Sequence, residues 1–222
     1  MRSSGSLSAI VQPTGTLGTG ASLRVDALSF AYPSRPLFVR WSADFSPGLH
    51  LVCGDDGCGK TTLLRLLAGE LCAQSGHLQM GASSLADDAA HYRQQVFRTD
   101  PASDAFASMT PLSWFETLRA RYPAFDTAQA GMLLERLFLQ EHRHKSGHMM
   151  STGSRRKVWL AAALASGATA MLFDQPFAAL DTPSIRVVTD LLQQAGASGR
   201  IVVLADHEPP AALVGAPTLW LT

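Results

Sequence analysis

Apolar and polar side chains alternate along residues 23–31 (LRVDALSFA), which is typical of a β-strand with one buried face. Pro33 and Pro36 then interrupt the alternation, so we expect no strand across them. Residues 49–53 (LHLVC) form a continuous apolar run that predicts a buried strand. A glycine-rich turn follows, and apolar positions at helical spacing over residues 61–71 predict a helix. The first third of the chain therefore predicts a β-rich opening, then a strand, a loop and a helix.

The spacing of apolar residues becomes helical over roughly residues 100–150. Thr110 followed by Pro111 is typical of a helix start, so we expect a helical lobe inserted here. Beyond this lobe the chain alternates helices with two short apolar strands, residues 170–174 and 201–206. Such alternation predicts a parallel α/β sheet.

The composition fits one domain and offers no general attraction for polyanions. The 222 residues are enough to bury a large core with an inserted lobe. The 18 basic and 18 acidic side chains cancel, so no nucleic-acid partner is expected without a local basic patch. We predict a flexible polar arm over residues 1–21 and one domain over residues 22–222.

The sequence predicts neither secretion nor a membrane span. Residues 1–21 lack the apolar run of a signal peptide. Residues 158–173, the most apolar later stretch, are fewer than the ~20 residues that span a bilayer. Cys53, Cys58 and Cys72 are too few for a disulfide framework and are expected to be reduced thiols in the cytoplasm. Any role at a membrane would require another polypeptide to supply the spans.

Residues 54–61 (GDDGCGKT) satisfy the phosphate-loop pattern G-x-x-x-x-G-K-[ST] between a predicted strand and a predicted helix. The glycines let backbone N–H groups turn toward phosphate oxygens, and the following helix directs its positive end at the same anion. The lysine supplies charge for the β and γ phosphates, and the threonine hydroxyl supplies a ligand for Mg²⁺. The two loop aspartates are unexpected beside phosphate unless both point outward. The predicted nucleotide contacts are Gly54, Asp55, Asp56, Gly57, Cys58, Gly59, Lys60, Thr61 and Thr62, with Lys60 also catalytic and Thr61 also a metal ligand.

The predicted strand at residues 170–174 ends in Asp174. An acid in this place puts a carboxylate beside the Mg²⁺ of a phosphate-loop nucleotide. A buried strand ending in an acid is common, but its pairing with a phosphate loop makes Asp174 the second predicted magnesium ligand.

Further motifs stand in a fixed order around the phosphate loop. Tyr32 precedes the loop, residues 150–154 (MSTGS) precede an apolar helix, and residues 174–181 (DQPFAALD) begin at the strand-end aspartate. His207 follows the last predicted strand. In this order the motifs resemble the ATP-binding cassette (ABC) ATPases over about residues 22–210. The resemblance implies an adenine contact for Tyr32, γ-phosphate contacts for Ser151 and Gly153, a nucleotide contact for Asp181 and a catalytic role for His207.

The resemblance also implies a fold and an activity. The fold would be α/β, a phosphate-loop ATPase core of the ABC type with an N-terminal antiparallel β element and an inserted helical lobe. The family implies ATP and Mg²⁺ as cofactors, and a second cassette, in a homodimer or a heterodimer, that sandwiches the ATP. It further implies a separate transmembrane permease subunit, which would hold this cytoplasmic chain at the inner face of the cell membrane. The expected function is to drive or gate a membrane transporter.

Residues 150–154 correspond to the signature segment of the family, and this signature is degenerate. Thr152 and Ser154 replace a glycine and a glutamine, whereas Ser151 and Gly153 keep the hydroxyl and the close-approach backbone of the family pattern.

Two further residues depart from the family pattern. Gln175 follows Asp174, where the family has a glutamate that polarises the attacking water. An amide can orient water but cannot take its proton, so we expect tight ATP binding and slow hydrolysis. Gln175 is either native or a substitution that traps ATP. Thr99 stands where the family has a metal-sensing glutamine and is the third predicted metal contact, unless Gln94 or Gln95 takes that place by a register shift.

A second function fits the same residues: a soluble ABC-type regulatory or assembly ATPase, in which slow turnover times a switch. Nucleic-acid-linked cassette ATPases are disfavoured by the neutral charge and by the lack of a paired second cassette. A metal site at Glu141, His142, His144 and His148 is also disfavoured, because their spacing matches no standard zinc site. We expect a solvated connector there.

Overall fold

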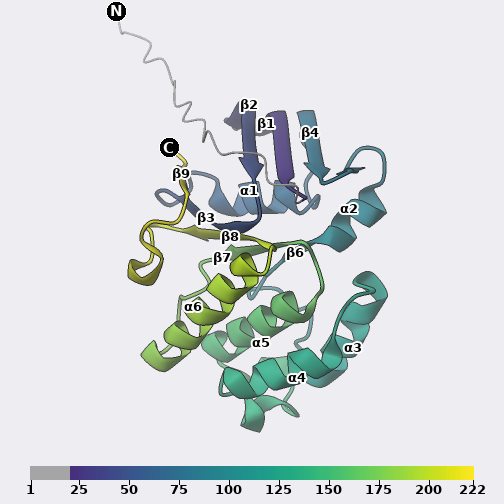
Figure 1. Cartoon of the computed structure of the whole chain (residues 1–222), viewed down its shortest axis with the longest axis vertical. Coiled ribbons are helices and arrows are strands. Elements are labelled where there is room, and N and C mark those ends of the chain that lie inside the picture. Colours follow the sequence, from purple (N-terminus) through teal and green to yellow (C-terminus); the bar gives the residue numbers. More distant parts are fainter. Residues whose placement is uncertain (1–20) are drawn as a thin grey trace, which may run out of the picture.

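The computed structural model describes residues 21–222, so the predicted arm lies outside the described residues except for Ala21. Two sheets and a group of helices form layers (Figure 1). An antiparallel sheet lies at the top of that view, a parallel sheet crosses the middle, and most helices lie below it. The predicted mixed α/β class, with an antiparallel element at the start of the chain, is confirmed.

The antiparallel sheet is built on a hairpin. Its strands are β1 (Leu23–Tyr32), β2 (Arg35–Phe45), β4 (Ser75–Met80) and β5 (Ser83–Ser84), in the spatial order β2-β1-β4-β5. The break that the sequence predicts from Pro33 to Pro36 is shorter in the structure. Only the turn at Pro33 and Ser34 separates β1 from β2, and Pro36 lies inside β2 opposite Ala31. An edge strand such as β2 tolerates a proline, since one of its sides has no partner strand.

The parallel sheet holds the predicted phosphate-loop strand between two neighbouring strands. Its members are β3 (Gly48–Cys53), β6 (Val96–Arg98), β7 (Ala170–Asp174), β8 (Ile201–Asp206) and β9 (Thr218–Trp220), in the order β6-β7-β8-β3-β9. The strands predicted at residues 49–53, 170–174 and 201–206 are confirmed as β3, β7 and β8. Because these three strands are parallel neighbours, the segments that follow their carboxyl ends meet at one edge of the sheet.

Helices connect the strands and form the predicted lobe. They are α1 (Lys60–Leu67), α2 (Ala89–Gln95), α3 (Pro111–Arg121), α4 (Thr127–Arg136), α5 (Thr152–Ala165) and α6 (Thr182–Ala197), with 3₁₀ turns η1 (Gln140–His142), η2 (Gly147–Met149) and η3 (Ala211–Leu213). The helix start predicted at Thr110 is confirmed, because Thr110 Oγ1 accepts the N–H of Ser113 at 3.2 Å and Pro111 opens α3. No helix within residues 21–222 is long and apolar enough to cross a membrane.

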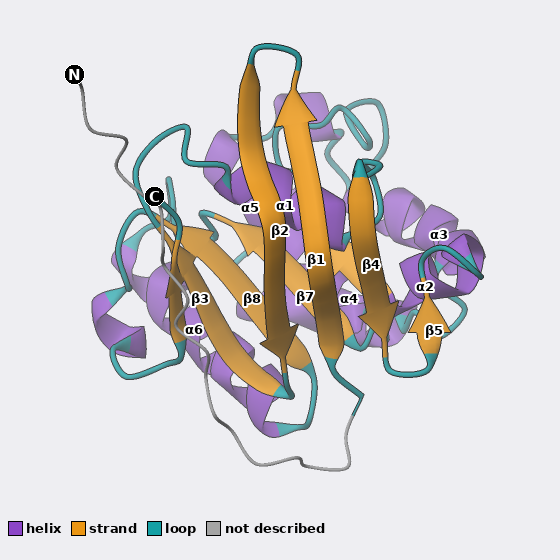
Figure 2. Cartoon of the chain, turned by 90° about the horizontal axis from the view of Figure 1, so that it is seen from above, coloured by secondary structure: helices purple, strands orange, loops and turns teal. Residues whose placement is uncertain are grey.

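The parallel sheet is buried on both faces, so β7 and β8 are apolar at successive positions. Ala170 and Leu172 pack with α1 and the antiparallel sheet, whereas Met171 and Phe173 pack with α5, α6 and the lobe. Seen from above, β1, β2 and β4 cross over the parallel strands (Figure 2). Both sheets therefore hold α1 and the preceding loop in a fixed position.

Candidate functional site

The phosphate loop runs from the end of β3 to the start of α1, and its backbone conformation requires glycine. Gly54 has φ 153°, and a Cβ there would lie 2.4 Å from the carbonyl oxygen of Leu221. Gly59 has φ 110° and caps α1 in a left-handed conformation without a side-chain bond. Glycine at these positions therefore allows the loop to turn tightly over the amino end of α1.

Lys60 directs its ammonium group back across the loop. Its Nζ donates hydrogen bonds to the carbonyl oxygens of Gly54, at 2.6 Å, and Asp55, at 2.8 Å. The side chain belongs to the first turn of α1, and the residue is 6% exposed. Backbone N–H groups, the helix dipole and a fixed cation thus converge where phosphates would bind.

Thr61 and Asp174 bring two oxygen atoms together at the edge of the sheet. Thr61 Oγ1 donates to Asp174 Oδ2 at 2.5 Å, which joins the start of α1 to the end of β7. A hydroxyl and a carboxylate are ligands that Mg²⁺ accepts, and this ion usually takes one or two protein oxygens beside phosphate and water. The donor set therefore fits Mg²⁺.

A cleft of about 500 Å³ lies beside these residues, a volume in the range of small-molecule sites. Tyr32, 42% exposed at the tip of the hairpin, forms one wall, and its hydroxyl is 3.1 Å from Thr62 Oγ1. An exposed ring at this end of the cleft is available for stacking on a base. The predicted contacts that line the cleft are Tyr32, Asp56, Gly57, Gly59, Lys60, Thr61, Thr62, Thr99, Asp174 and Gln175.

Gln175 and His207 lie side by side because they follow adjacent parallel strands. Gln175 has φ 46°, and its N–H donates to the carbonyl of Ala205 at 2.8 Å. Its Nε2 lies 3.0 Å from Nε2 of His207, and the same ring nitrogen lies 3.5 Å from Oδ1 of Asp56. The structure therefore joins Gln175 and His207, two of the three predicted catalytic residues, directly to each other and to the phosphate loop.

The predicted contacts Ser151, Gly153 and Asp181 are absent from the walls of this cleft, as far as the described residues define it. Ser151 caps α5 by accepting the N–H of Ser154 at 3.1 Å. Asp181 caps α6, and its hydrogen bonds with Ser184 lower the pKa of its carboxyl. A Cβ on Gly153 would lie 2.4 Å from the carbonyl oxygen of Ala179, so the signature glycine permits close contact with the segment after β7.

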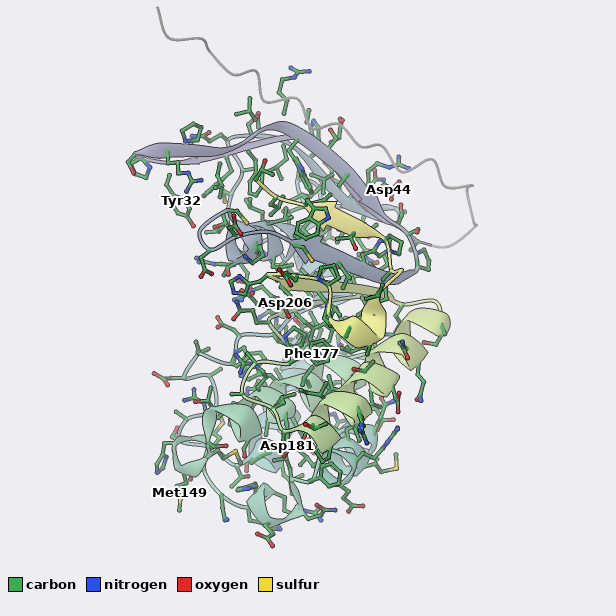
Figure 3. All side chains as sticks on the ribbon, turned by 90° about the vertical axis from the view of Figure 1, so that its left-hand side faces the viewer. Tyr32, Asp44, Met149, Phe177, Asp181 and Asp206 are labelled. Atoms are coloured by element: carbon green, nitrogen blue, oxygen red, sulfur yellow. The ribbon has the colours of Figure 1, made fainter. Side chains whose placement is uncertain are left out.

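Met149, which directly precedes residues 150–154, marks the position of that segment on the molecule. In Figure 3, Tyr32 and Met149 lie toward the same side of the view, with Tyr32 near the top and Met149 near the bottom. Met149 is 63% exposed and directly precedes the signature segment. Tyr32, at one end of the cleft, and Met149, beside the signature, thus lie at opposite ends of one side of the chain.

Thr99 is placed less favourably for a metal than the sequence suggested. It lines the cleft but is only 3% exposed. Its hydroxyl donates to the carbonyl of Leu172 at 3.4 Å, and its N–H donates to the same oxygen at 2.9 Å. Of the proposed substitutes, Gln95 donates instead to the hydroxyl of Ser83. The metal role of Thr99 stays a prediction.

Basic residues that the sequence reasoning missed also line the cleft. Arg35 donates to the carbonyl of Gly57 at 3.2 Å, and Arg156 donates to that of Ala178 at 2.5 Å. Burial lowers the pKa of Arg156, and the carboxylate of Asp174 opposes this effect. The sequence did carry a signal for Arg156, namely the basic run at the start of α5. Because only one face of a helix points toward the cleft, one residue of that run could have been expected to line it.

A second hollow, of about 330 Å³, adjoins the first between the sheet and the helical lobe. Its walls include Trp114, Tyr122 and Trp159, and it shares Arg98 and Asp100 with the nucleotide cleft. Arg98 Nη2 lies 2.8 Å from Asp100 and 2.9 Å from Glu70, and these partners raise the pKa of Arg98 against the effect of burial. An ion-paired arginine therefore connects the two hollows.

Comparison with known proteins gives the family. The family described as "ABC transporter" matches residues 41–178 of this chain. A taurine import ATP-binding protein, TauB of Chromobacterium violaceum, is 33% identical over 205 residues, which cover 90% of this chain and 78% of that protein. A cytochrome c biogenesis ATP-binding export protein, CcmA of Nitrosococcus oceani, is 33% identical over 190 residues, or 83% of this chain and 85% of that protein.

Solved structures agree on the fold. The ATP-binding subunit of an ABC transporter superposes with a TM-score of 0.81 at 20% identity, covering 90% of this chain and 85% of that one. A bacterial Atm1-family ABC exporter with ATP bound gives a TM-score of 0.78 at 19% identity, covering 96% of this chain and 39% of that one. The predicted phosphate-loop core of the ABC type is therefore confirmed. The chain belongs to the ATP-binding proteins of the ABC transporter family, which are ATPases.

Proposed function

We propose that this chain binds Mg-ATP in the cleft beside Lys60 and, as a dimer that sandwiches ATP, drives or gates conformational change in a membrane transporter. The observation that carries the proposal is the convergence of four groups at one sheet edge. They are the fixed Lys60 ammonium, the Thr61–Asp174 oxygen pair, the aromatic wall at Tyr32 and the paired Gln175 and His207. Each is suited to one part of Mg-ATP.

Thr61 and Asp174 would hold the Mg²⁺, which would neutralise negative charge on the phosphates. Lys60 would bind the β and γ phosphates as a point charge. Gln175 would orient the attacking water without accepting its proton. ATP would consequently bind tightly and be hydrolysed slowly.

A second cassette would complete each site. Ser151 and Gly153 belong to the family signature, yet they lie away from the cleft of their own chain. A partner turned end to end would bring its signature to this cleft, because Tyr32 of the cleft wall and Met149 beside the signature lie at opposite ends of one side. ATP contacted by both chains would favour the closed dimer, and hydrolysis would release it.

The membrane spans would come from a separate permease subunit, which would hold the chain at the inner face of the cell membrane. The names of the relatives support this role, since one is an import protein and another an export protein. The hollow that shares Arg98 and Asp100 with the nucleotide cleft offers a route by which a bound subunit would respond to ATP.

The test compares Lys60→Ala with the parent chain for ATP affinity and for ATP-dependent dimerisation by analytical ultracentrifugation. Lys60→Ala should abolish both, because it removes the cation and the bonds to Gly54 and Asp55. Arg65→Ala, which removes a cation from the same helix outside the cleft, is the matched control. A dimer that persists without nucleotide in Lys60→Ala would contradict the sandwich.

A soluble regulatory or assembly ATPase is the second candidate, and Gln175 and Thr99 favour it. Slow turnover and a departure at the metal-sensing position suit a timed switch at least as well as a pump. Affinity purification of the tagged chain from gently solubilised cells separates the two functions. A multispanning protein recovered in stoichiometric amount supports transport, and recovery with soluble partners alone supports regulation.

A further inference from the structure

The His207 imidazole lies between two side chains that come from other elements. Its Nε2 atom is 3.0 Å from Gln175 Nε2 and 3.5 Å from Asp56 Oδ1. Gln175 follows β7, His207 follows β8 and Asp56 lies in the loop after β3, so three neighbouring parallel strands deliver the cluster. Asp56 and Gln175 both line the nucleotide cleft.

One ring nitrogen faces both partners, and it carries at most one hydrogen. Without that hydrogen, Nε2 accepts from the Gln175 amide; with it, Nε2 donates to Asp56 or to Gln175 Oε1 after the amide turns over. A carboxylate only accepts, so a hydrogen bond to Asp56 requires hydrogen on Nε2. The neutral amide pairs with either form and selects neither.

Other carboxylates do not take the place of Asp56. Among residues 21–222, no other carboxylate oxygen lies within 4.0 Å of a His207 ring nitrogen. Asp206, the preceding residue, accepts the backbone N–H of His207 at 2.8 Å and is engaged with the main chain. Glu208 flanks the other side, and Lys60 is bonded to loop carbonyls. Asp56 is therefore the acid placed to act on the ring.

We propose that Asp56 is a positioning residue which supplies, from the phosphate loop, the carboxylate that position 175 lacks. This inference rests on the proposed ATPase function and extends it. Asp56 holds His207 with hydrogen on Nε2 and balances the charge of the imidazolium. The imidazolium stabilises negative charge on the γ-phosphate while the bond from phosphorus to the ADP oxygen breaks and the bond to the water oxygen forms. The water proton leaves on the phosphate, and the ring keeps its own.

Steady-state kcat of four chains tests the inference: the parent, Asp56→Asn, Gln175→Glu and the double variant. Asp56→Asn should lower kcat of the parent about threefold, the size of one exposed ion pair lost from the transition state. ATP affinity should not weaken, because the change removes negative charge from a phosphate site. With Gln175→Glu present, the same substitution should have little effect, since position 175 then supplies a carboxylate to the ring.

Glu208→Gln is the matched control, because it removes one exposed negative charge from the residue beside His207. An equal loss of kcat in both backgrounds, or the same loss from Glu208→Gln, would overturn the role of Asp56. A second measurement does not depend on turnover: the ¹⁵N chemical shift of His207 Nε2 without ATP. Asp56→Asn should move that shift toward the form without hydrogen, and an unchanged shift refutes the proposal. An inactive parent, by contrast, refutes the ATPase function itself.

Discussion

At the scale of single residues, the proposed function makes Gln175 the side chain that would limit the rate of hydrolysis. Its backbone and its contact with His207 place the amide at the end of β7 beside Asp174. The amide keeps the shape of a glutamate side chain and loses its capacity to accept a proton.

Gln175→Glu should therefore raise steady-state ATP hydrolysis about 10²-fold or more, which is the lower range for a general base. Phosphate release under saturating Mg-ATP measures the change. Gln194→Glu, on the exposed face of α6, is the control for an added carboxylate elsewhere and should leave the rate unchanged. Equal rates for the parent and Gln175→Glu would remove Gln175 as the cause of slow turnover.

Side-chain positions fixed by local motifs could be predicted from the sequence, and positions set by distant pairs could not. The Lys60 ammonium and the Thr61–Asp174 pair lie as predicted beside the cleft, because the loop pattern and a strand-end acid fix backbone positions. The approach of Asp56 to His207 depends on the order of three strands and on two side-chain conformations. No spacing along the chain carries that information.

At the scale of elements, α5 depends on a residue far from it in sequence. Arg200, just before β8, donates to the carbonyls of Leu164, at 2.7 Å, and Ala163, at 3.1 Å, in the last turn of the helix. It also donates to the carbonyl of Ala168 at 2.9 Å. Burial lowers the pKa of Arg200 to about 10, which leaves the guanidinium charged at neutral pH. The cation therefore satisfies and charge-balances the carboxyl end of α5.

Arg200→Ala should lower the free energy of unfolding by about 3 kcal/mol, because it leaves several partly buried carbonyls without a donor. The stability of Arg200→Lys should fall between those of the parent and Arg200→Ala. An ammonium group lacks the planar fork of a guanidinium and cannot donate to all of these carbonyls. Urea denaturation followed by circular dichroism gives the values. Arg186→Ala, an exposed position on α6, should change stability by less than about 0.5 kcal/mol. A similar loss from both alanine variants would contradict the capping role.

Elements marked by a local sequence pattern could be predicted, and elements stabilised only by pairing with another strand could not. Thr110 and Pro111 mark the start of α3 locally, and β7 and β8 are continuous apolar runs up to their final aspartates. By contrast, β9 has three residues and exists because it pairs with the edge of β3. The sequence predicts a strand break at Pro36, since it does not show that β2 is an edge strand.

At the scale of the whole molecule, the arrangement of cleft and signature makes a prediction about two chains. The walls of the cleft come from the hairpin, the phosphate loop and the strand ends, while Ser151 lies exposed at the start of α5. If each ATP is held by the loop of one chain and the signature of its partner, defects in the two parts should complement each other.

Ser151→Asp should keep α5 capped, because aspartate caps helices as well as serine does, and should repel the γ-phosphate of ATP on the partner. Alone, neither Ser151→Asp nor Lys60→Ala should form an ATP-dependent dimer. Mixed, they should form one, because the loop of the Ser151→Asp chain faces the intact signature of the Lys60→Ala chain. Ser151→Asn, a neutral cap, should dimerise as the parent does. Sedimentation of the mixture distinguishes this arrangement from one in which each chain binds ATP with its own signature. In that second arrangement the mixture should form no ATP-dependent dimer, because every chain carries a defect in its own site.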